Sequence, residues 1–319
     1  MTPSLGGLTR ILLRRGFQAM MLGLIVGTLC FLMIRSLPGD MAMRIASNRY
    51  GYDLVGNEAA RAVSAELGAQ LSGWPALLGW LGDLLQLDLG RSLVTNETVW
   101  DEISHQLGAT LRLSLGALGL GALIGIPLGL LCAWRAGGVI DRLVLGLTVV
   151  LRATPPFLLA VLLMLVVAVK MGMVPVAGDV HGSTSLLLPS LTLALGLAAG
   201  LARVTRNSFL DVLQTPAWNF ARIKGLSDGQ ALVRHGLRNA AVPILSWLGV
   251  QAVFLVEGTV VIETLFAWPG IGHALVHAIF ARDVPVIQGT ALTIGLLFVA
   301  FNLLVDACCL WLDPRQRKA

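Results

Sequence analysis

The chain has few charged residues, which make up 13% of its 319 residues, against about 25% in ordinary soluble domains. Hydrophobic residues account for 56%. This balance excludes a soluble globular fold and predicts an all-α integral membrane protein. A membrane-spanning helix needs about 20 mostly apolar residues. Six apolar segments are interpreted as spans: 17–37, 109–134, 143–169, 186–201, 244–266 and 290–312.

Lysine is also rare, and no nucleotide site is visible in the sequence. None of Lys170, Lys224 and Lys318 follows a glycine, so the phosphate-binding G-x-x-x-x-G-K-[ST] loop is absent. Ser-His-Asp and H-E-x-x-H spacings are absent too. The 4 cysteines lie inside the expected spans without C-x-x-C spacing, which indicates buried small hydrophobic residues. We therefore expect a chain that is no enzyme and binds no cofactor, so that any ATP is hydrolysed by another subunit.

Positive charges alternate along the chain, and this alternation predicts the orientation of the spans. Most of the 23 Lys and Arg residues lie in four segments: 1–16, 135–142, 203–243 and 313–319. These segments are expected to be cytosolic, so both termini are cytosolic and 38–108 is extracytoplasmic. The net charge of +5 follows from this topology and gives no reason to expect nucleic-acid binding.

A polar, basic stretch between the fourth and fifth spans is expected to form two short helices. Residues 217–224 are interpreted as the first helix, and Gly225 stands where a left-handed C-terminal cap would end it. Ser227 and Gln230 have the spacing of a capping box, which begins a second helix. This helix is expected to carry Arg234 and Arg238 and to run through Pro243 into the fifth span. A cytosolic helix pair on a membrane protein indicates a docking device. We expect a partner to bury three of its apolar side chains: Trp218, Phe220 and Leu232.

The same stretch contains a recognisable set of residues: Ala221, Gly225, Leu226, Ser227, Arg234, His235, Arg238, Asn239 and Pro243. With this set it resembles the "EAA" coupling loop of importer-type ATP-binding cassette (ABC) permeases, in the version of the peptide/nickel permease family. Asn219 and Phe220 replace the polar or small residues usual at the first EAA positions, while the spacing to Gly225 is kept. Further matches follow in order along most of the chain: 37–40, 88–92, 124–129, 188–189, 268–272, 282–289 and 302–306.

The resemblance implies the six-span fold of a type I ABC importer permease with cytosolic coupling helices. The implied divisions are a cytosolic flank (1–16), a first span (17–37), an extracytoplasmic segment (38–108), a five-helix core (109–312) with its coupling loop (203–243), and a cytosolic tail (313–319). Such a subunit forms half of a translocation pathway in the bacterial cytoplasmic membrane. Its implied partners are a second homologous permease, two ABC ATPases that hold ATP and Mg, an extracytoplasmic substrate-binding protein and the lipid bilayer.

The resemblance also implies contacts between the coupling loop and the ATPases. The residues expected to make them are Ala217, Trp218, Phe220, Ala221, Lys224, Gly225, Ser227 and Asp228. We expect the loop to act as a rigid lever that moves when the ATPases close. The alternative is that these residues only cap and pack a cytosolic hairpin.

Three residues inside the expected spans are candidates for the pathway. Pro155 and Pro156 should break the third span, and such breaks occur where a cavity or a neighbouring helix satisfies the freed backbone groups. They either line a pathway or reflect helix packing. Glu257 lies inside the fifth span, where it lines the pathway and favours cationic cargo, pairs with an arginine, or is protonated near the outer interface. Arg152, beside the break, is expected to snorkel.

The sequence leaves the cargo open among peptides, nickel and metal chelates. Residues 266–288 look closest to nickel-type members of the family. His273 and His277 are four residues apart and share a helix face, so they could hold a transition metal; the alternative is two exposed histidines on a short helix.

Two other classes of protein stay open as alternatives. One is a secondary transporter with its own ion relay, and the other is a membrane scaffold that moves nothing. The small number of acids inside the spans (Glu257, Glu263 and Asp306) and the lack of a visible internal repeat argue against the first. The exposed coupling loop, with its family-like residues, argues against both.

Overall fold

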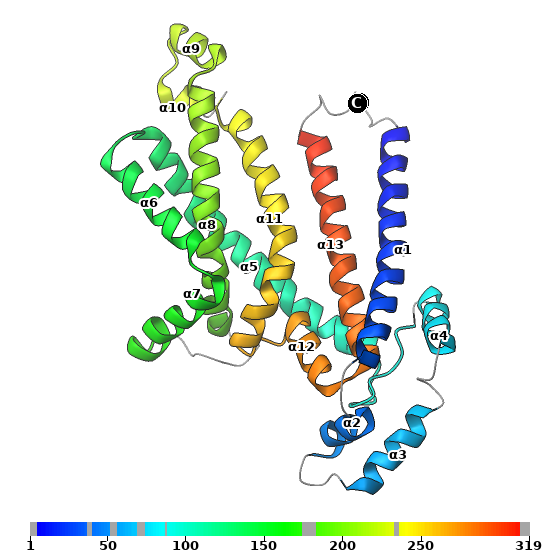
Figure 1. Ribbon diagram of the computed structural model, residues 1–319. Helices are drawn as coiled ribbons and strands as arrows, with labels where there is room; N and C mark the ends of the chain where they lie inside the picture. The colour runs from blue at the N-terminus through cyan, green and yellow to red at the C-terminus, as the bar shows by residue number, and fades with distance from the viewer. Residues whose placement is uncertain are drawn as a thin grey trace. The chain divides into compact units, whose positions relative to one another are not determined.

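The structure is a computed structural model that describes residues 5–36, 40–51, 56–68, 74–86, 88–173, 183–232 and 236–312. Within these ranges it is helical, with one isolated β-bridge between Arg91 and Thr98 (Figure 1). Contacts divide the chain into two compact units. The core unit comprises Met1–Gly7, Leu111–Trp268 and Phe301–Ala319, and the flanking unit comprises Leu8–Thr110 and Pro269–Ala300.

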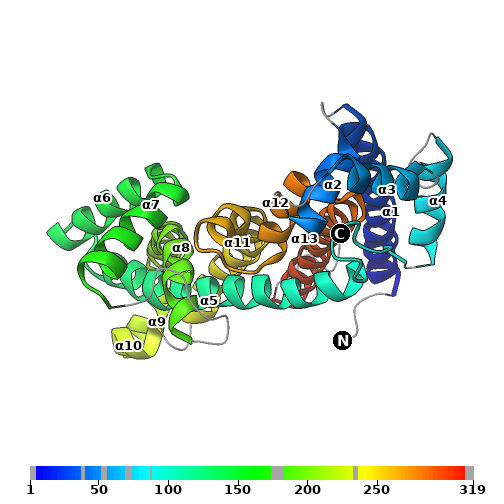
Figure 2. The ribbon, with the colours of Figure 1, turned by 90° about the horizontal axis from the view of Figure 1, so that it is seen from below.

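The core unit is built around one long helix, α8. The helices of the core unit are the later part of α5 (Val99–Trp134), α6 (Val139–Ala153), α7 (Pro156–Leu163), the π-helix η1 (Met164–Lys170), α8 (Ser183–Leu213), α9 (Pro216–Ile223), α10 (Asp228–Ala231) and α11 (Leu237–Leu265). Helix α8 runs between the α6–α7 pair and α11 and contacts all three (Figure 1, Figure 2). Most of its apolar segment is buried, as expected for the centre of a helical bundle.

Glycines let α5 approach α8 closely. Gly125 and Gly129 are four residues apart on α5, so they share one face of the helix. A Cβ atom on Gly125 would lie 2.9 Å from the carbonyl oxygen of Ala198, and one on Gly129 would lie 2.4 Å from that of Ala202. Small residues of this kind are typical of helix contacts in membranes, because without a hydrophobic driving force the helices depend on close packing.

The break predicted at the two prolines is present. Helices α6 and α7 meet at an angle of 105°, and Thr154 and Pro155 form the extended turn between them. Pro156 begins α7, a position where its missing N–H leaves no intrahelical partner unsatisfied. The third expected span is therefore a bent pair of helices.

The flanking unit combines helices from the first third of the chain with helices that follow α11. They are α1 (Leu5–Ser36), α2 (Met41–Tyr50), α3 (Asn57–Gly68), α4 (Trp74–Leu85), the beginning of α5, α12 (Ile271–Ala281) and the first part of α13 (Val284–Leu312). Helix α4 packs on α1, where the Trp80 ring occupies the notch that Gly27 leaves: a Cβ there would lie 2.2 Å from the ring. Leu22 of α1 similarly lies against Gly295 of α13.

One buried carboxylate joins parts of the flanking unit that are far apart in the sequence. Asp283 is only 3% exposed, and it accepts hydrogen bonds from the Ser92 hydroxyl at 2.5 Å and from the Leu93 N–H at 3.1 Å. The Val94 N–H donates at 3.3 Å, and the Val286 N–H in the first turn of α13 donates at 3.5 Å. Two of the stretches that resemble the permease family therefore meet at this side chain.

The all-α class is confirmed for the described residues, and the number of spans is partly tested. Among the described residues, three helical segments are long and apolar enough to cross a membrane: Val99–Trp134, Ser185–Leu213 and Val284–Leu304. The bent pair of α6 with α7 and η1 adds a fourth. The other two expected spans fall almost wholly within α1 and α11, which have 32 and 29 residues. The total of six stays a prediction.

Candidate functional site

The coupling loop forms α9 where the sequence predicted the first helix, and a short helix α10 begins where the second was predicted. Helix α10 ends at Ala231, and residues 233–235, through which the second helix would continue, lie outside the described residues. Helix α9 begins at Pro216, and its N-cap residue Thr215 accepts a hydrogen bond on its hydroxyl from the Trp218 N–H at 3.3 Å. Proline suits the first helical position because its fixed backbone angle matches the helix and it has no N–H to leave unpaired. This end of the helix is therefore set by local chemistry.

The other end of α9 is closed by a Schellman motif. The Leu226 N–H donates to the carbonyl of Ala221 at 3.2 Å, and the Gly225 N–H donates to that of Arg222 at 2.9 Å. Gly225 has φ +82°, the left-handed conformation that the motif requires and that glycine adopts without a steric penalty. The left-handed cap predicted at Gly225 is confirmed.

Helix α10 begins with the predicted capping box. The Ser227 N–H donates to the Gln230 side-chain oxygen at 3.2 Å, and the Gln230 N–H donates to the Ser227 hydroxyl at 3.4 Å. Two N–H groups at the start of the helix are thereby satisfied reciprocally. The side chain of Asp228, another expected coupling residue, lies outside the described part of the structure.

One face of α9 is packed within the chain, which corrects part of our expectation. Trp218 is 6% exposed and belongs to a buried cluster with Phe209 and Ala221, while Leu232 packs against the same cluster. The prediction that Trp218 needs a partner to be buried is therefore wrong. The sequence showed that an aromatic side chain lies on a short helix, but not that the end of α8 lies beneath it.

The opposite face of α9 is apolar and exposed. Phe220 is 58% exposed and Ile223 is 82% exposed, and they lie three residues apart on one side of the helix. The Lys224 ammonium lies 4.6 Å from the centre of the Phe220 ring, within the range of a cation–π contact. We call Phe220 and Ile223 the α9 ridge. Sequence reasoning missed Ile223, although its spacing from Phe220 could have revealed it.

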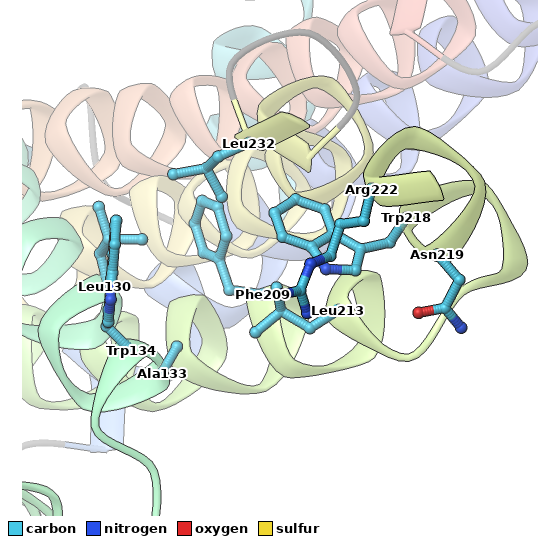
Figure 3. A pocket seen from close by; sticks show the side chains of 9 residues that line it. All are labelled: Leu130, Ala133, Trp134, Phe209, Leu213, Trp218, Asn219, Arg222 and Leu232. Carbon is cyan, nitrogen blue, oxygen red and sulfur yellow. The ribbon is translucent and has the colours of Figure 1, made fainter. Parts of the chain in front are cut away.

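A pocket of about 320 Å³ lies between α9 and the C-terminal ends of α5 and α8 (Figure 3). Its walls come from the end of α5, the last turns of α8, α9 itself and the residue after α10. The lining residues are Leu130, Ala133, Trp134, Phe209, Leu213, Trp218, Asn219, Arg222 and Leu232. Most of the lining residues are apolar, and Trp218 belongs both to this lining and to the buried cluster that joins α9 to α8.

An ion pair that the sequence did not reveal ties α6 to α8. The Arg206 Nε and Nη2 atoms donate to the two carboxylate oxygens of Asp141 at 2.6 and 2.7 Å, and the Gly137 N–H donates to the same carboxylate at 2.8 Å. The Asp141 side chain is almost wholly buried. A buried charge is tolerated only when it is paired and hydrogen-bonded, and this arrangement meets both conditions.

The residues proposed for the pathway are only partly described. Pro155 and Pro156 are exposed at the bend between α6 and α7. Glu257 belongs to α11, but its side chain lies outside the described part of the structure, so its role stays a prediction. The remaining coupling residues, Ala217 and Ser227, are exposed.

The two histidines considered for metal binding do face each other. The ring centres of His273 and His277 are 4.4 Å apart on α12, and the rings are inclined by 59°. Partial burial lowers the pKa of His273, and the neighbouring His277 lowers it further, so the neutral form that binds metals is favoured. No group of three or more His, Cys, Asp or Glu side chains suited to a metal occurs among the described residues. A metal at this pair stays a prediction.

Comparisons with protein families and with known sequences both match this chain to membrane components of transport systems. The family described as "Binding-protein-dependent transport system inner membrane component" matches residues 125–318. A putative peptide transport system permease protein of Brucella abortus (strain 2308) is 38% identical over 317 residues, covering 97% of this chain and 99% of the relative. A glutathione transport system permease protein of Pectobacterium atrosepticum is 38% identical over 297 residues, covering 92% of this chain and 94% of the relative.

Two solved structures share the fold. One is the crystal structure of an amino acid ABC transporter with histidines, and the other is an inward-facing methionine ABC transporter. Each matches with a TM-score of 0.54 and 18% identity over 66% of this chain, which corresponds to 93% and 96% of the solved chains. At this identity the likeness concerns the fold alone.

Proposed function

We propose a specific role for this chain, which belongs to the family of binding-protein-dependent transport system inner membrane components: it couples ATP hydrolysis to import through the α9 ridge. The chain is a permease subunit of an ABC importer. In our proposal the ridge of Phe220 and Ile223 sits in a groove of an ATPase subunit. Two large apolar side chains, exposed on a short and firmly capped helix, are the observation that carries this proposal.

The capping of α9 suits it to transmit movement. A Schellman motif closes one end, and Trp218 fastens the inner face to the end of α8. Helix α8 is in turn joined to α6 by the ion pair of Asp141 and Arg206. When the ATPases close around ATP, a push on the ridge would therefore reach the packed helices of the core unit as a rigid-body motion.

The remaining parts of the proposed assembly follow from the same role. The chain would form half of a pathway, with a second homologous permease as the other half. Two ATPase subunits would hold ATP and Mg, and an extracytoplasmic binding protein would deliver the cargo. Both termini and the α9 ridge would be cytosolic, as the distribution of Lys and Arg favours.

For the cargo we propose peptides. The relatives reported above are named for peptides and glutathione, which is itself a short peptide, and they give no support for nickel. Pro155, Pro156 and Glu257 remain our proposed pathway residues, on the argument that broken helices and acids within spans occur beside cavities.

The docking proposal can be tested with Phe220→Asp. A charge at the centre of an apolar interface should weaken ATPase association by about 2 kcal/mol or more, or roughly 30-fold, so the ATPases should no longer copurify with the permease. Phe280→Asp is the matched control, because Phe280 is 72% exposed on α12 and lies outside the ridge. Normal ATPase copurification and normal import by Phe220→Asp would reject the proposed function.

A further inference from the structure

The pocket between α9 and the C-terminal ends of α5 and α8 has a chemistry that the proposed function does not use. Trp218 and Arg222 of α9 are four residues apart and line this pocket, whereas the two side chains of the α9 ridge do not. The other walls include Trp134 at the end of α5 and Leu213 at the end of α8. Three helices of the core unit therefore meet around one cavity, on the side of α9 away from the ridge.

The lining combines apolar walls with a single charge. Arg222 is the one ionisable side chain among the 9 lining residues. Figure 3 shows the Arg222 side chain extending toward Leu213 and the Trp218 ring. Arg222 is also exposed to solvent, so it lies at the mouth of the pocket. A guanidinium group has five N–H donors and no acceptor, and it therefore favours an anion. These features fit a small organic anion with an apolar body.

The position and the size of the pocket indicate where such an anion comes from. Phe209, Leu213 and Trp218 follow the expected fourth span (186–201) and lie in the segment expected to be cytosolic (203–243), so a ligand enters from the cytosol. The volume of about 320 Å³ is near the lower end of small-molecule sites, which measure about 300–1,000 Å³. The cytosol is also the side on which an importer releases its cargo. A short peptide with one large apolar side chain has both an apolar body and a terminal carboxylate.

We propose that this pocket binds a short peptide from the cytosol and that its occupancy slows import, so that the released product regulates the importer. The inference rests on the proposed function of the chain as a subunit of a peptide importer. The peptide carboxylate pairs with Arg222, whose guanidinium group offers two parallel N–H donors to the two carboxylate oxygens. The apolar side chain of the peptide lies against Trp218 and Leu213.

Slower import follows from the three helices that the ligand touches. A peptide that contacts α5, α8 and α9 at once is bound best by the arrangement in which these helices form the pocket. Its binding shifts the population toward that arrangement. Import requires the helices of the core unit to move when the ATPases close, so a ligand that favours one arrangement slows the cycle.

Direct binding tests the site without transport. The purified importer, with its ATPases but without the binding protein or ATP, is titrated with alanyl-phenylalanine in a calorimeter. Arg222→Gln should weaken binding of this dipeptide about tenfold or more, because the charge-assisted hydrogen bonds to the carboxylate are lost. The dipeptide amide, which lacks the carboxylate, should bind the unaltered importer about tenfold more weakly for the same reason. Leu213→Trp should also weaken dipeptide binding, because the larger ring fills part of the pocket.

The matched control is Arg142→Gln. Arg142 is exposed on α6, donates a hydrogen bond to the Gly137 carbonyl and is not among the lining residues, so its replacement should leave the affinity unchanged. No binding by the unaltered importer would overturn the inference, as would equal affinities of Arg222→Gln, Leu213→Trp and the unaltered importer. Binding to the permease pair but not to the complex with ATPases would overturn it too, since an ATPase side chain would then fill the pocket.

Inside-out vesicles measure the effect on import. The binding protein and labelled trialanine are sealed inside and ATP is added outside, so that import appears as release of trialanine into the medium. Alanyl-phenylalanine in the medium should slow this release about threefold or more at saturation, and Arg222→Gln should raise its half-inhibitory concentration about tenfold. Binding without inhibition would overturn the inference. An importer that releases no trialanine even without the dipeptide would reject the proposed function and with it the regulatory role, while the titration alone would decide whether the pocket is a peptide site.

Discussion

Two regions of this molecule are both held by local hydrogen bonds, but one is buried and the other leaves apolar side chains exposed. In the flanking unit, the Asp283 carboxylate gathers a hydroxyl and several N–H groups around itself and is buried. In the core unit, capping hydrogen bonds are formed at both ends of α9, while the side chains of Phe220 and Ile223 are exposed. The first region is hydrogen-bonded and buried within the chain, whereas the second has an apolar surface that the described residues of its unit leave exposed.

The difference indicates which region depends on a partner. A buried carboxylate with its donors in place gains nothing from a further protein and fixes the loops around it. An exposed apolar ridge on a rigid helix gains free energy when a partner removes it from water, at about 25 cal/mol per Å² of apolar surface. We therefore assign the structural role to the Asp283 cluster and the docking role to the α9 ridge.

The largest expected effect concerns the side of the membrane on which each region lies. In a cysteine-free chain, Thr95→Cys next to the Asp283 cluster should react fully with an impermeant maleimide added outside intact cells. Gln214→Cys, just before α9, should react only after the membrane is opened. Both residues are exposed, so access is decided by topology. The measurement is maleimide labelling before and after permeabilisation.

The outcome that would break the comparison is external labelling at position 214. It would place the α9 ridge outside, where no ATPase can reach it, and would invert the orientation drawn from the positive charges. Labelling of both positions from outside would mean that the two regions do not lie on opposite sides of the membrane.

The next largest effect is expected in the Asp283 cluster. Asp283→Ala removes the acceptor of at least three donors, and each buried donor left without a partner costs about 1–3 kcal/mol. We expect a loss of stability on the order of 3–9 kcal/mol, measured as a lower thermal unfolding midpoint of the purified complex. Import should fall only in proportion to the amount of folded permease.

Asp88→Ala is the matched control for this change. Asp88 is exposed and accepts a hydrogen bond from the Gly90 N–H in the same loop, so its loss should cost about 1 kcal/mol or less. A thermal midpoint for Asp283→Ala equal to that of Asp88→Ala would show that the buried cluster does not hold the flanking unit together.

The features that the sequence predicted well are those encoded over a few residues. The glycine cap at Gly225, the capping box of Ser227 with Gln230 and the break at Pro155 each depend on a spacing of at most three positions. Backbone sterics and nearby side chains decide them, so they follow from the sequence with little help from the rest of the fold.

The features that sequence reasoning missed depend on distant contacts. Arg206 is 65 residues from Asp141, and Ser92 is 191 residues from Asp283, so no local pattern pairs them. For the same reason Trp218 was expected to need a partner for its burial, whereas residues at the end of α8 cover it. Periodicity shows which residues share a face, but only the packing of α8 decides which face is covered.

The smallest change in the free energy of unfolding is expected from Gly225→Val. This substitution tests the docking role of the α9 ridge separately from stability. Gly225 has φ +82° and no neighbouring atom near the site of a new Cβ, so the substitution would strain the backbone without a clash. The left-handed conformation costs a residue with a Cβ atom about 1–2 kcal/mol. The strain should misplace the α9 ridge, so ATP-driven import should be lost while the amount of permease in the membrane is unchanged.

Gly229→Val isolates this conformational cause. Gly229 in α10 is equally open, but its φ is not positive, so valine there should leave import close to normal. Gly225→Asn should fall between the two, because asparagine adopts the left-handed region more readily than valine does. If import is measured per inserted permease and Gly225→Val transports as well as Gly229→Val, the turn does not position the ridge. The α9 ridge would then be a surface that the ATPases contact without using it as a lever.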